Sequence, residues 1–240
     1  MIEHLLIAHG SPDARHATTM SNLVQDVCSR GVRCEVAYLE HNSPTVEGWL
    51  SAQGDVQSAD DDVAVTGLLL APGYHAQVDV PRLLATAPST LTIEDRGPLG
   101  VGPWLNPTLD DLVARSGGTS STPVIVTAAG SSRADARAYL AEFVAQWGST
   151  RPGPVTFAVA TGPGQSVTDA IATAEGRGND TIVLPLMISP GVLADRVADL
   201  AHKSGVRVGG TLADSPAFVD ALVGQLDLNR AVMDSHTTTE

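Results

Sequence analysis

Short apolar runs alternate with longer amphipathic stretches along the whole chain. The runs are rich in Val, Ile and Leu and end near Gly, Pro or Ser, which is typical of strands in a buried sheet. The stretches between them repeat apolar residues every three or four positions, as helices packed on a sheet do. This alternation predicts βαβ units around parallel sheets. The predicted strands cover residues 5–8, 32–40, 63–71, 90–97, 123–130, 155–162, 181–189 and 206–212.

The second half of the chain repeats the first. The segment IAHGSPDAR at 7–15 corresponds to TAAGSSRADAR at 127–137, with Gly10 matching Gly130. Two further pairs of segments correspond in the same order, 71–84 with 189–202 and 96–105 with 209–218. Internal similarity of this kind indicates a duplicated unit. We therefore predict an α/β fold of two duplicated four-stranded parallel-sheet βα units with a cleft between them.

Glycine and serine residues near the middle of the chain mark the boundary between the copies. The segment SGGTSST at 116–122 has the composition of a linker, because it offers little to bury. The chain ends in a stretch that we interpret as a frayed terminus. The expected parts are a first unit at 1–116, a linker at 117–122, a second unit at 123–227 and a flexible tail at 228–240.

Two imidazoles distinguish the copies. His9 in the first copy corresponds to Ala129 in the second, and His75 corresponds to Leu193. The loop glycines persist in both copies, so the fold itself does not require these histidines. We infer that the first copy uses them for chemistry.

These histidines and one acid all follow predicted strands. His9 comes directly after the first strand, Glu40 ends the second, and His75 follows the third. In an open parallel sheet, ligands bind beyond the carboxyl ends of the strands, so we expect the three side chains to converge. Two imidazoles and a carboxylate can hold Fe²⁺ or Co²⁺ and leave coordination positions open. Imidazole also accepts protons near neutrality, and metal insertion into a macrocycle needs both abilities.

At these residues the sequence resembles the sirohydrochlorin chelatases, the small class II cobalt and iron chelatases. The motifs that carry the resemblance are HGSP at 9–12, Leu39-Glu40 followed by Pro44, and PGYHAQVDVP at 72–81. The resemblance extends over both halves and is strongest in the first. It implies a lyase that inserts Fe²⁺ or Co²⁺ into sirohydrochlorin or a related tetrapyrrole, in sirohaem or cobalamin biosynthesis. The metal is then a substrate, and no organic cofactor is expected.

The resemblance also implies roles for individual residues. His9 and His75 are the metal-binding and catalytic groups, and Glu40 assists them. Double-length members of the family place both units in one chain, which implies a monomer with an internal pseudo-dimer. We expect the tetrapyrrole to be held by helix N-termini, by basic side chains and by the loop after the third strand. The expected substrate-binding residues are Gly10, Ser11, Arg15, Gly73, Tyr74, Ser131 and Arg133.

Other polar residues have expected structural places. Asp79 precedes Val80-Pro81 and is predicted to cap a helix that begins there. His16 is expected to border the cleft on the first predicted helix. Cys28 and Cys34 are too few and too unusually spaced for a disulfide framework or a zinc site, so we interpret both as packing residues.

Composition narrows the choice of partners. The formal net charge of −13 argues against nucleic acid and anionic membranes, because such partners need clustered Lys and Arg. The glycines at 97, 100 and 102 do not form a dinucleotide fingerprint, so no NAD is expected. The N-terminus lacks the regions of a secretory signal, and no apolar stretch is long enough to span a bilayer. The expected compartment is therefore the cytoplasm.

The sequence leaves two other functions open. Two histidines and one acid suffice for a metal or tetrapyrrole carrier without turnover, and the negative charge disfavours rapid capture of an acidic substrate. Ser11 could serve as the nucleophile of a hydrolase, although HGSP is not a Gly-x-Ser-x-Gly elbow. These ligands do not distinguish iron, cobalt and nickel. The lack of a His-rich tract slightly favours the sirohaem pathway.

Overall fold

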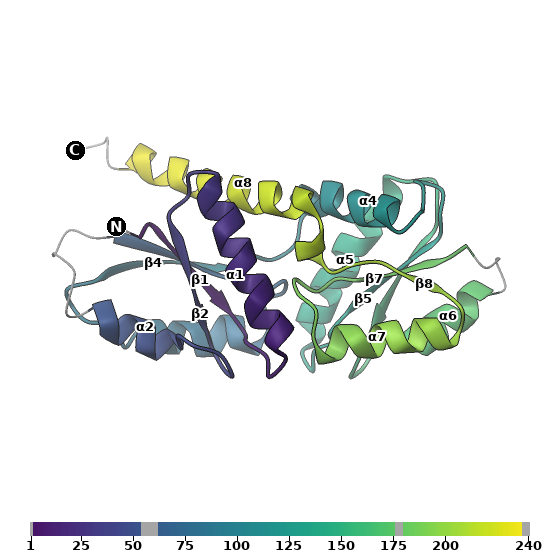
Figure 1. Cartoon of the computed structure of the whole chain (residues 1–240), viewed down its shortest axis with the longest axis horizontal. Helices are drawn as coiled ribbons and strands as arrows, with labels where there is room; N and C mark the ends of the chain where they lie inside the picture. The colour runs from purple at the N-terminus through teal and green to yellow at the C-terminus, as the bar shows by residue number, and fades with distance from the viewer. Residues whose placement is uncertain (1, 54–61, 176–179, 237–240) are drawn as a thin grey trace. The chain divides into compact units, whose positions relative to one another are not determined.

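The chain folds into two compact units that differ from the predicted halves. A computed structural model describes residues 2–53, 62–175 and 180–236, with only the backbone described for 175 and 228–236 (Figure 1). The first unit joins Met1–Gly100 to Val219–Glu240, and the second is Val101–Phe218. Each unit is considered by itself.

A four-stranded parallel sheet forms the centre of the first unit. Its strands are β1 (His4–Ala8), β2 (Cys34–Tyr38), β3 (Asp62–Gly67) and β4 (Thr92–Pro98), in the order β2-β1-β3-β4. The helical elements are α1 (Ala14–Ser29), α2 (Val46–Gln53), the π-helical turn η1 (His75–Asp79), α3 (Val80–Leu84) and the C-terminal part of α8 (Pro216–His236). Figure 1 shows α2 and α8 on opposite sides of this sheet.

Apolar side chains on both faces of β1 explain why this strand lies inside the sheet. All five of its residues are buried, as expected for a central parallel strand covered on two sides. On one face Leu5 and Ile7 pack in a cluster with Trp49 of α2 and Val80 of α3. The packing of Val80 against this face therefore fixes the position of α3 and of the turn η1 that precedes it.

The C-terminal helix is tied to the first unit by polar contacts as well. The Arg30 guanidinium, directly after α1, donates a hydrogen bond of 2.7 Å to Asp220. Arg96 in β4 donates one of 3.3 Å to the carbonyl oxygen of Leu226. The Leu222 and Leu226 side chains are fully buried, so apolar packing accompanies these bonds.

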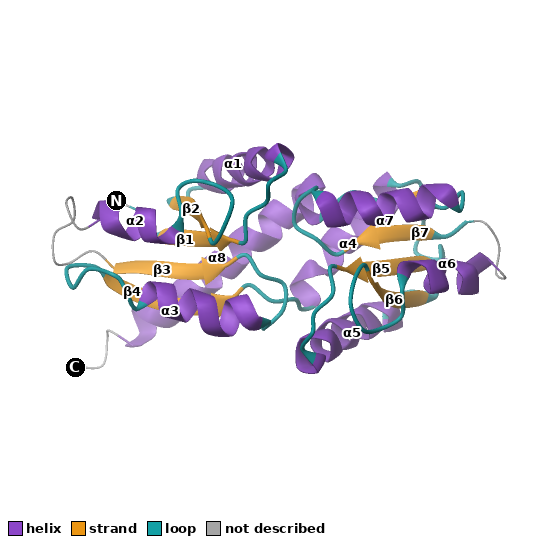
Figure 2. Ribbon diagram, turned by 90° about the horizontal axis from the view of Figure 1, so that it is seen from below, coloured by secondary structure: helices purple, strands orange, loops and turns teal. Residues whose placement is uncertain are grey.

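The second unit repeats the sheet. Its strands are β5 (Val124–Ala128), β6 (Val155–Val159), β7 (Ile182–Pro185) and β8 (Arg207–Val208), in the order β6-β5-β7-β8 and all parallel. Figure 2 shows β5 with β6 and β7 on either side of it. The helical elements are η2 (Pro103–Leu105), α4 (Asn106–Arg115), α5 (Ala134–Ser149), α6 (Val167–Glu175), α7 (Val192–Lys203) and η3 (Leu212–Asp214). The matching strand order confirms the predicted α/β fold of two duplicated four-stranded sheets.

Tertiary contacts group the chain differently from its sequence repeats. The division falls at Gly100 and Val101, so that α4 belongs to the second unit. The segment 117–122 therefore joins α4 to β5 within one unit. There the guanidinium of Arg151 donates hydrogen bonds to the carbonyl oxygens of Thr119, Ser120 and Thr122. The expected linker is thus an anchored loop, because buried hydrogen bonding replaces the apolar burial that its sequence lacks.

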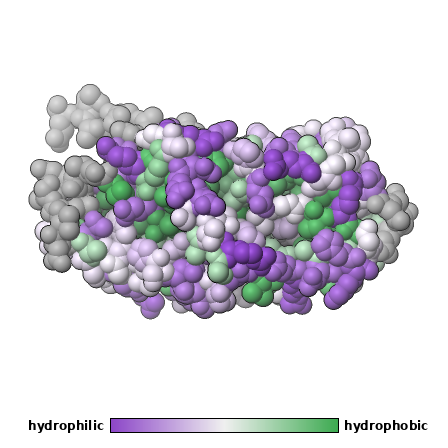
Figure 3. Space-filling model, in the orientation of Figure 1, coloured by the Kyte–Doolittle hydropathy of each residue, from purple (hydrophilic) through white to green (hydrophobic). Residues whose placement is uncertain are grey.

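The end of the chain also departs from the expected tail. Helix α8 continues to His236, so most of the predicted tail at 228–240 is helical, and residues 237–240 lie outside the described residues. Within the parts of the chain that are described, no helix is both long and apolar enough to cross a membrane. On the face seen in Figure 3, hydrophilic residues predominate and apolar ones form separate groups.

The two cysteines lie side by side in the first unit, with 3.8 Å between their sulfur atoms. Cys34 is buried, and that burial raises the pKa of its thiol to about 12. Cys28 is exposed. The interpretation as a packing residue therefore holds for Cys34, whereas Cys28 is exposed at the end of α1 and contacts the buried Cys34 through its sulfur.

Candidate metal-binding site

A glycine positions the first histidine. Gly10 has φ +93°, and a Cβ atom there would lie 1.8 Å from the backbone oxygen of Glu40. Only glycine permits both this conformation and this close approach. The loop after β1 therefore lies directly against the chain that follows β2, and the Glu40 amide donates a 2.9 Å hydrogen bond to the carbonyl oxygen of His9. His9 is held at the carboxyl end of the central strand.

The second histidine begins the π-helical turn η1. The Val80 amide donates to the carbonyl oxygen of His75, five residues earlier, which defines the wide turn. Pro81 follows and has no amide hydrogen to donate, which suits the interruption of the helical pattern. Turns of this kind occur frequently at functional sites.

The two imidazoles meet as the sequence predicts. The Nε2 atom of His9 lies 3.2 Å from the Nε2 atom of His75. The ring centroids are 4.5 Å apart and the ring planes stand at 83°. Two nitrogens bound about 2.0–2.1 Å from one metal ion, at angles of about 90–109°, would be about 2.8–3.4 Å apart. The observed distance already suits a shared ion.

The Nδ1 atoms of both rings have oxygen partners. The Nδ1 atom of His9 lies 3.1 Å from the carbonyl oxygen of Gly10, and the Nδ1 atom of His75 lies 2.7 Å from Oδ2 of Asp79. A ring that donates from Nδ1 to such an oxygen keeps the lone pair of its Nε2 atom for another ligand. The two Nε2 atoms therefore face one another across the position that a shared ion would take.

Asp79 has a different role from the predicted one. Its backbone is helical, at φ −72° and ψ −48°, and its side chain makes no capping hydrogen bond. The prediction of a helix cap is wrong, because η1 leads into α3 without a break and leaves no helix terminus to cap. The carboxylate binds His75 instead. The four-residue spacing of His75 and Asp79 is the signal that would have revealed this contact.

Glu40 does not join the two imidazoles. Its side chain is 55% exposed, and its carboxylate lies 3.5 Å from Nε2 of His41. Among the described residues, no group of three or more His, Cys, Asp or Glu side chains could hold a metal ion. The catalytic role of Glu40 therefore stays a prediction, and its observed contribution is the backbone contact with Gly10.

The polar groups predicted to bind substrate in the first unit already have partners within the protein. Ser11 donates its amide hydrogen to the Asn42 side chain at 2.8 Å, and its hydroxyl accepts from the Asp13 amide at 3.1 Å. Asp13 caps α1 and pairs with Arg15. Hydrogen bonds from Arg15 lower the pKa of the Asp13 carboxyl to about 2. The Ser11 hydroxyl thus serves the turn, which does not support a nucleophilic role.

The loop around His75 has a different character. Tyr74 is 58% exposed, and its ring centroid lies 6.2 Å from that of His75. A side chain at Gly73 would meet open space. Tyr74 is therefore accessible beside His75, and the space at Gly73 is open.

The second unit has the same loop without the imidazoles. Gly130 has φ +106°, and a Cβ atom there would lie 2.0 Å from the backbone oxygen of Thr161. The Ser131 hydroxyl accepts from the Arg133 amide at 3.1 Å, and Arg133 pairs with Asp135. The close approach of this glycine to the neighbouring loop is therefore a property of the fold, whereas His9 and His75 have no counterparts in the second unit.

His16 lies close to the pair, as expected for a residue bordering the site. It is half-buried on α1, and its ring centroid is 6.0 Å from that of Tyr38. Burial, and then the neighbouring charge of His9, lowers the pKa of His16. Its ring is therefore disposed to be neutral when His9 is charged.

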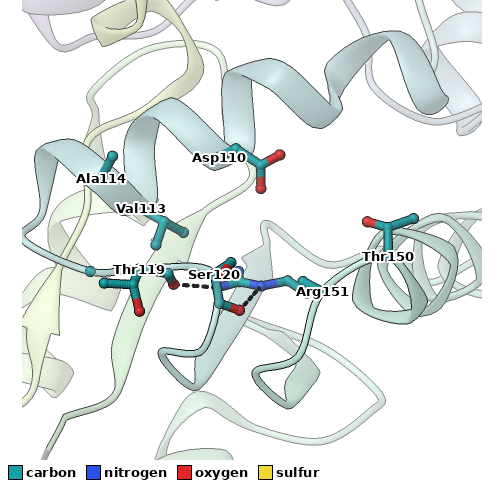
Figure 4. A pocket seen from close by; sticks show the side chains of 8 residues that line it. Asp110, Val113, Ala114, Thr119, Ser120, Thr150 and Arg151 are labelled. Atoms are coloured by element: carbon teal, nitrogen blue, oxygen red, sulfur yellow. Dashed lines mark hydrogen bonds between the residues drawn. The ribbon is translucent and has the colours of Figure 1, made fainter.

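A separate cavity lies in the second unit. Its volume is about 160 Å³, and its lining includes Asp110, Val113, Thr150 and Arg151 (Figure 4). The lining contains neither histidine and none of the predicted substrate-binding residues.

Comparisons with known proteins agree with the fold. The sequence model of the CbiX family matches residues 3–116 and 123–227. The structure "SirB from Bacillus subtilis with Fe3+" is similar at 20% identity and a TM-score of 0.79, over 95% of each chain. The sirohydrochlorin chelatase SirB from Bacillus subtilis subspecies spizizenii, in complex with cobalt, is similar at 19% identity and 0.70, over 94% of each.

A third solved structure is CbiX, described as the terminal enzyme for siroheme biosynthesis in denitrifying bacteria. It is 17% identical, with a TM-score of 0.71, and the match covers 94% of this chain and 98% of that one. At these identities the structures show a shared fold. No curated protein matches the chain.

Proposed function

Because the chain belongs to the CbiX family of class II chelatases, we propose that it inserts Fe²⁺ or Co²⁺ into sirohydrochlorin or a close relative. The observation that carries the proposal is the 3.2 Å separation of the Nε2 atoms of His9 and His75. The second unit, with Ala129 and Leu193 at the corresponding positions, has the fold without this pair. The similar SirB structures with Fe3+ and with cobalt support a metal as the substrate.

In the proposed reaction the histidines first bind the ion. The two Nε2 atoms bind the ion and leave the remaining coordination positions to water and then to the macrocycle. Transfer of the ion frees both Nε2 atoms, which then receive the two pyrrole protons. Glu40, which ends exposed at the same edge, relays protons to solvent. The substrate metal and the product protons therefore use the same nitrogen atoms in turn.

The macrocycle approaches through the loop that carries Tyr74. The exposed Tyr74 ring provides an apolar contact for one face of the tetrapyrrole, and the open space at Gly73 leaves room for the macrocycle. Arg15, with the loop at Ser11, contacts the substrate carboxylates, and contacts from Ser131 and Arg133 of the second unit stay a prediction from the sequence. Arg15 and Arg133 must share their guanidinium groups with Asp13 and Asp135, so we assign them weaker contributions than the histidines.

An insertion assay tests the proposal. Purified protein is incubated with sirohydrochlorin and Fe²⁺ or Co²⁺, and the visible spectrum of the macrocycle is followed with time. A His9→Ala, His75→Ala double variant should lose the protein-dependent rate, whereas His202→Ala, which changes an exposed histidine of α7, should retain it. Equal rates for the wild type and the double variant would refute catalysis by the pair. The ratio of the Fe²⁺ and Co²⁺ rates assigns the preferred metal.

A carrier that binds metal without turnover is the second candidate. It is favoured by the lack of a third protein ligand beside the two imidazoles among the described residues. A carrier would bind Co²⁺ stoichiometrically and yield at most one product per protein molecule. Multiple turnovers would exclude it. We also propose a monomer, because one chain already contains both copies of the unit, and light scattering after gel filtration tests this.

A further inference from the structure

We propose that Asp79 is a positioning residue for His75, and that a one-residue insertion in the first unit creates the turn that brings the two together. The inference rests on the proposed metal-binding function of His75. It concerns the Nδ1 atom of His75, on the other side of the ring from the Nε2 atom that is proposed to bind the metal. It assigns a role to a residue that sequence reasoning treated as structural.

The carboxylate has one main partner. Oδ2 of Asp79 lies 2.7 Å from Nδ1 of His75, and the Asp79 side chain is only 21% exposed. Its other oxygen lies 3.8 Å from Nη2 of Arg82, whose side chain is 75% exposed. An exposed ion pair of that length contributes little. The short contact with His75 therefore accounts for the orientation of the carboxylate.

The insertion is visible in the buried positions of the two units. In the first unit the buried residues Ala76, Val80 and Leu84 are four residues apart. In the second, Ala194, Val197 and Ala201 are buried at spacings of three and then four. The first unit thus has one extra residue between its first two buried positions, and the ungapped match of 71–84 with 189–202 shifts by one residue after Ala76. The wide turn η1 accommodates that residue while Val80 keeps its place in the core.

The extra residue changes what lies beside the imidazole. The turn places Asp79 within reach of His75 without moving the apolar side chains that hold α3 on the sheet. A carboxylate accepts hydrogen bonds only, so it keeps a proton on Nδ1 and leaves the Nε2 lone pair for the metal. It also fixes the rotation of the ring. In the second unit no imidazole is present at the corresponding position, Leu193.

Variants at Asp79 separate positioning from folding. Asp79→Ala should weaken Co²⁺ binding about 10–100-fold and reduce the insertion rate by a similar factor. Asp79→Asn keeps an oxygen that can accept a hydrogen bond from Nδ1, so its losses of Co²⁺ affinity and insertion rate should be smaller. Gln77→Ala, an exposed change on the same turn, should match the wild type. The visible absorption bands of bound Co²⁺ provide a second readout, because they report the geometry of the ligands, and thermal melting reports the fold.

The outcomes distinguish the two proposals. If the wild type fails to bind Co²⁺ and to insert it, the proposed function is wrong and Asp79 has no metal ligand to position. If the wild type does both and Asp79→Ala has the same affinity, spectrum and rate, positioning by Asp79 is refuted. Positioning by Asp79 is equally refuted if Gln77→Ala loses as much Co²⁺ affinity and insertion rate as Asp79→Ala. The losses would then come from disturbance of the turn and not from removal of the carboxylate.

Discussion

Replacement of Gly10 by alanine provides a test of how the loop after β1 places the Nε2 atom of His9, which is proposed to bind the metal. Alanine at φ +93° is strained by about 1–2 kcal/mol, and its Cβ atom would lie 1.8 Å from the Glu40 oxygen. Relief of that overlap to an ordinary contact of about 3.3 Å requires the loop to move by about 1.5 Å. His9 is the adjacent residue, so its Nε2 atom moves by a similar amount. A distance of 3.2 Å to His75 would then exceed the range of about 2.8–3.4 Å that one ion permits.

We expect Gly10→Ala to reduce Co²⁺ affinity at least tenfold, measured by titration under conditions in which the protein stays folded. Gly130→Ala is a matched control, because a Cβ atom there lies 2.0 Å from the Thr161 oxygen in a loop without histidine. Both variants should lower the melting temperature, and only Gly10→Ala should affect metal binding. Loss of affinity in both, or in neither, would refute the reasoning that links this glycine to the position of His9.

Three other predictions follow from described contacts. The affinity for Co²⁺ should fall as the pH is lowered, because an imidazole nitrogen must be deprotonated to bind a metal; titration at several pH values measures this, and an affinity independent of pH would contradict binding through the pair. Leu5→Ala should cost about 2–5 kcal/mol of unfolding free energy in urea, since Leu5 is fully buried in the first core; a change below about 1 kcal/mol would show that the cluster closes the cavity. Arg151→Met should lower the free energy of unfolding by about 2 kcal/mol and expose the 119–122 loop to proteolysis, because three carbonyl oxygens lose their donor. Unchanged cleavage would show that the loop is stable without these hydrogen bonds.

Much of the fold could be predicted because parallel strands are buried on both faces. Runs such as Leu5 to Ala8 are apolar at every position, and their short length between Gly and Pro residues favours a buried strand over a helix. The histidines were identified by comparison of the two copies, since a residue present in only one copy is not needed for the fold. This comparison works without any structural information.

The errors have equally specific causes. An aspartate before Val80-Pro81 has the composition of a helix start, and this pattern outweighed the four-residue spacing to His75, which belongs to a helix that has already begun at the π-helical turn. Glu40 follows a strand as His9 does, but His41 next to it adopts φ 65° and the carboxylate contacts its neighbour rather than the pair. The unit on which a helix packs, as for α4, depends on tertiary contacts that a repeat pattern does not contain.

The grouping of Val219–Glu240 with Met1–Gly100 has a consequence for synthesis of the protein. The ribosome makes the sheet bearing both imidazoles first, but Leu222 and Leu226, which are buried in the finished fold, emerge only after the whole second unit. The hydrogen bonds that Arg30 and Arg96 donate to α8 can form only after this helix has been synthesised. The half of the chain that is translated first is thus completed last, and a nascent polypeptide stalled before residue 219 carries the histidines on an unfinished domain.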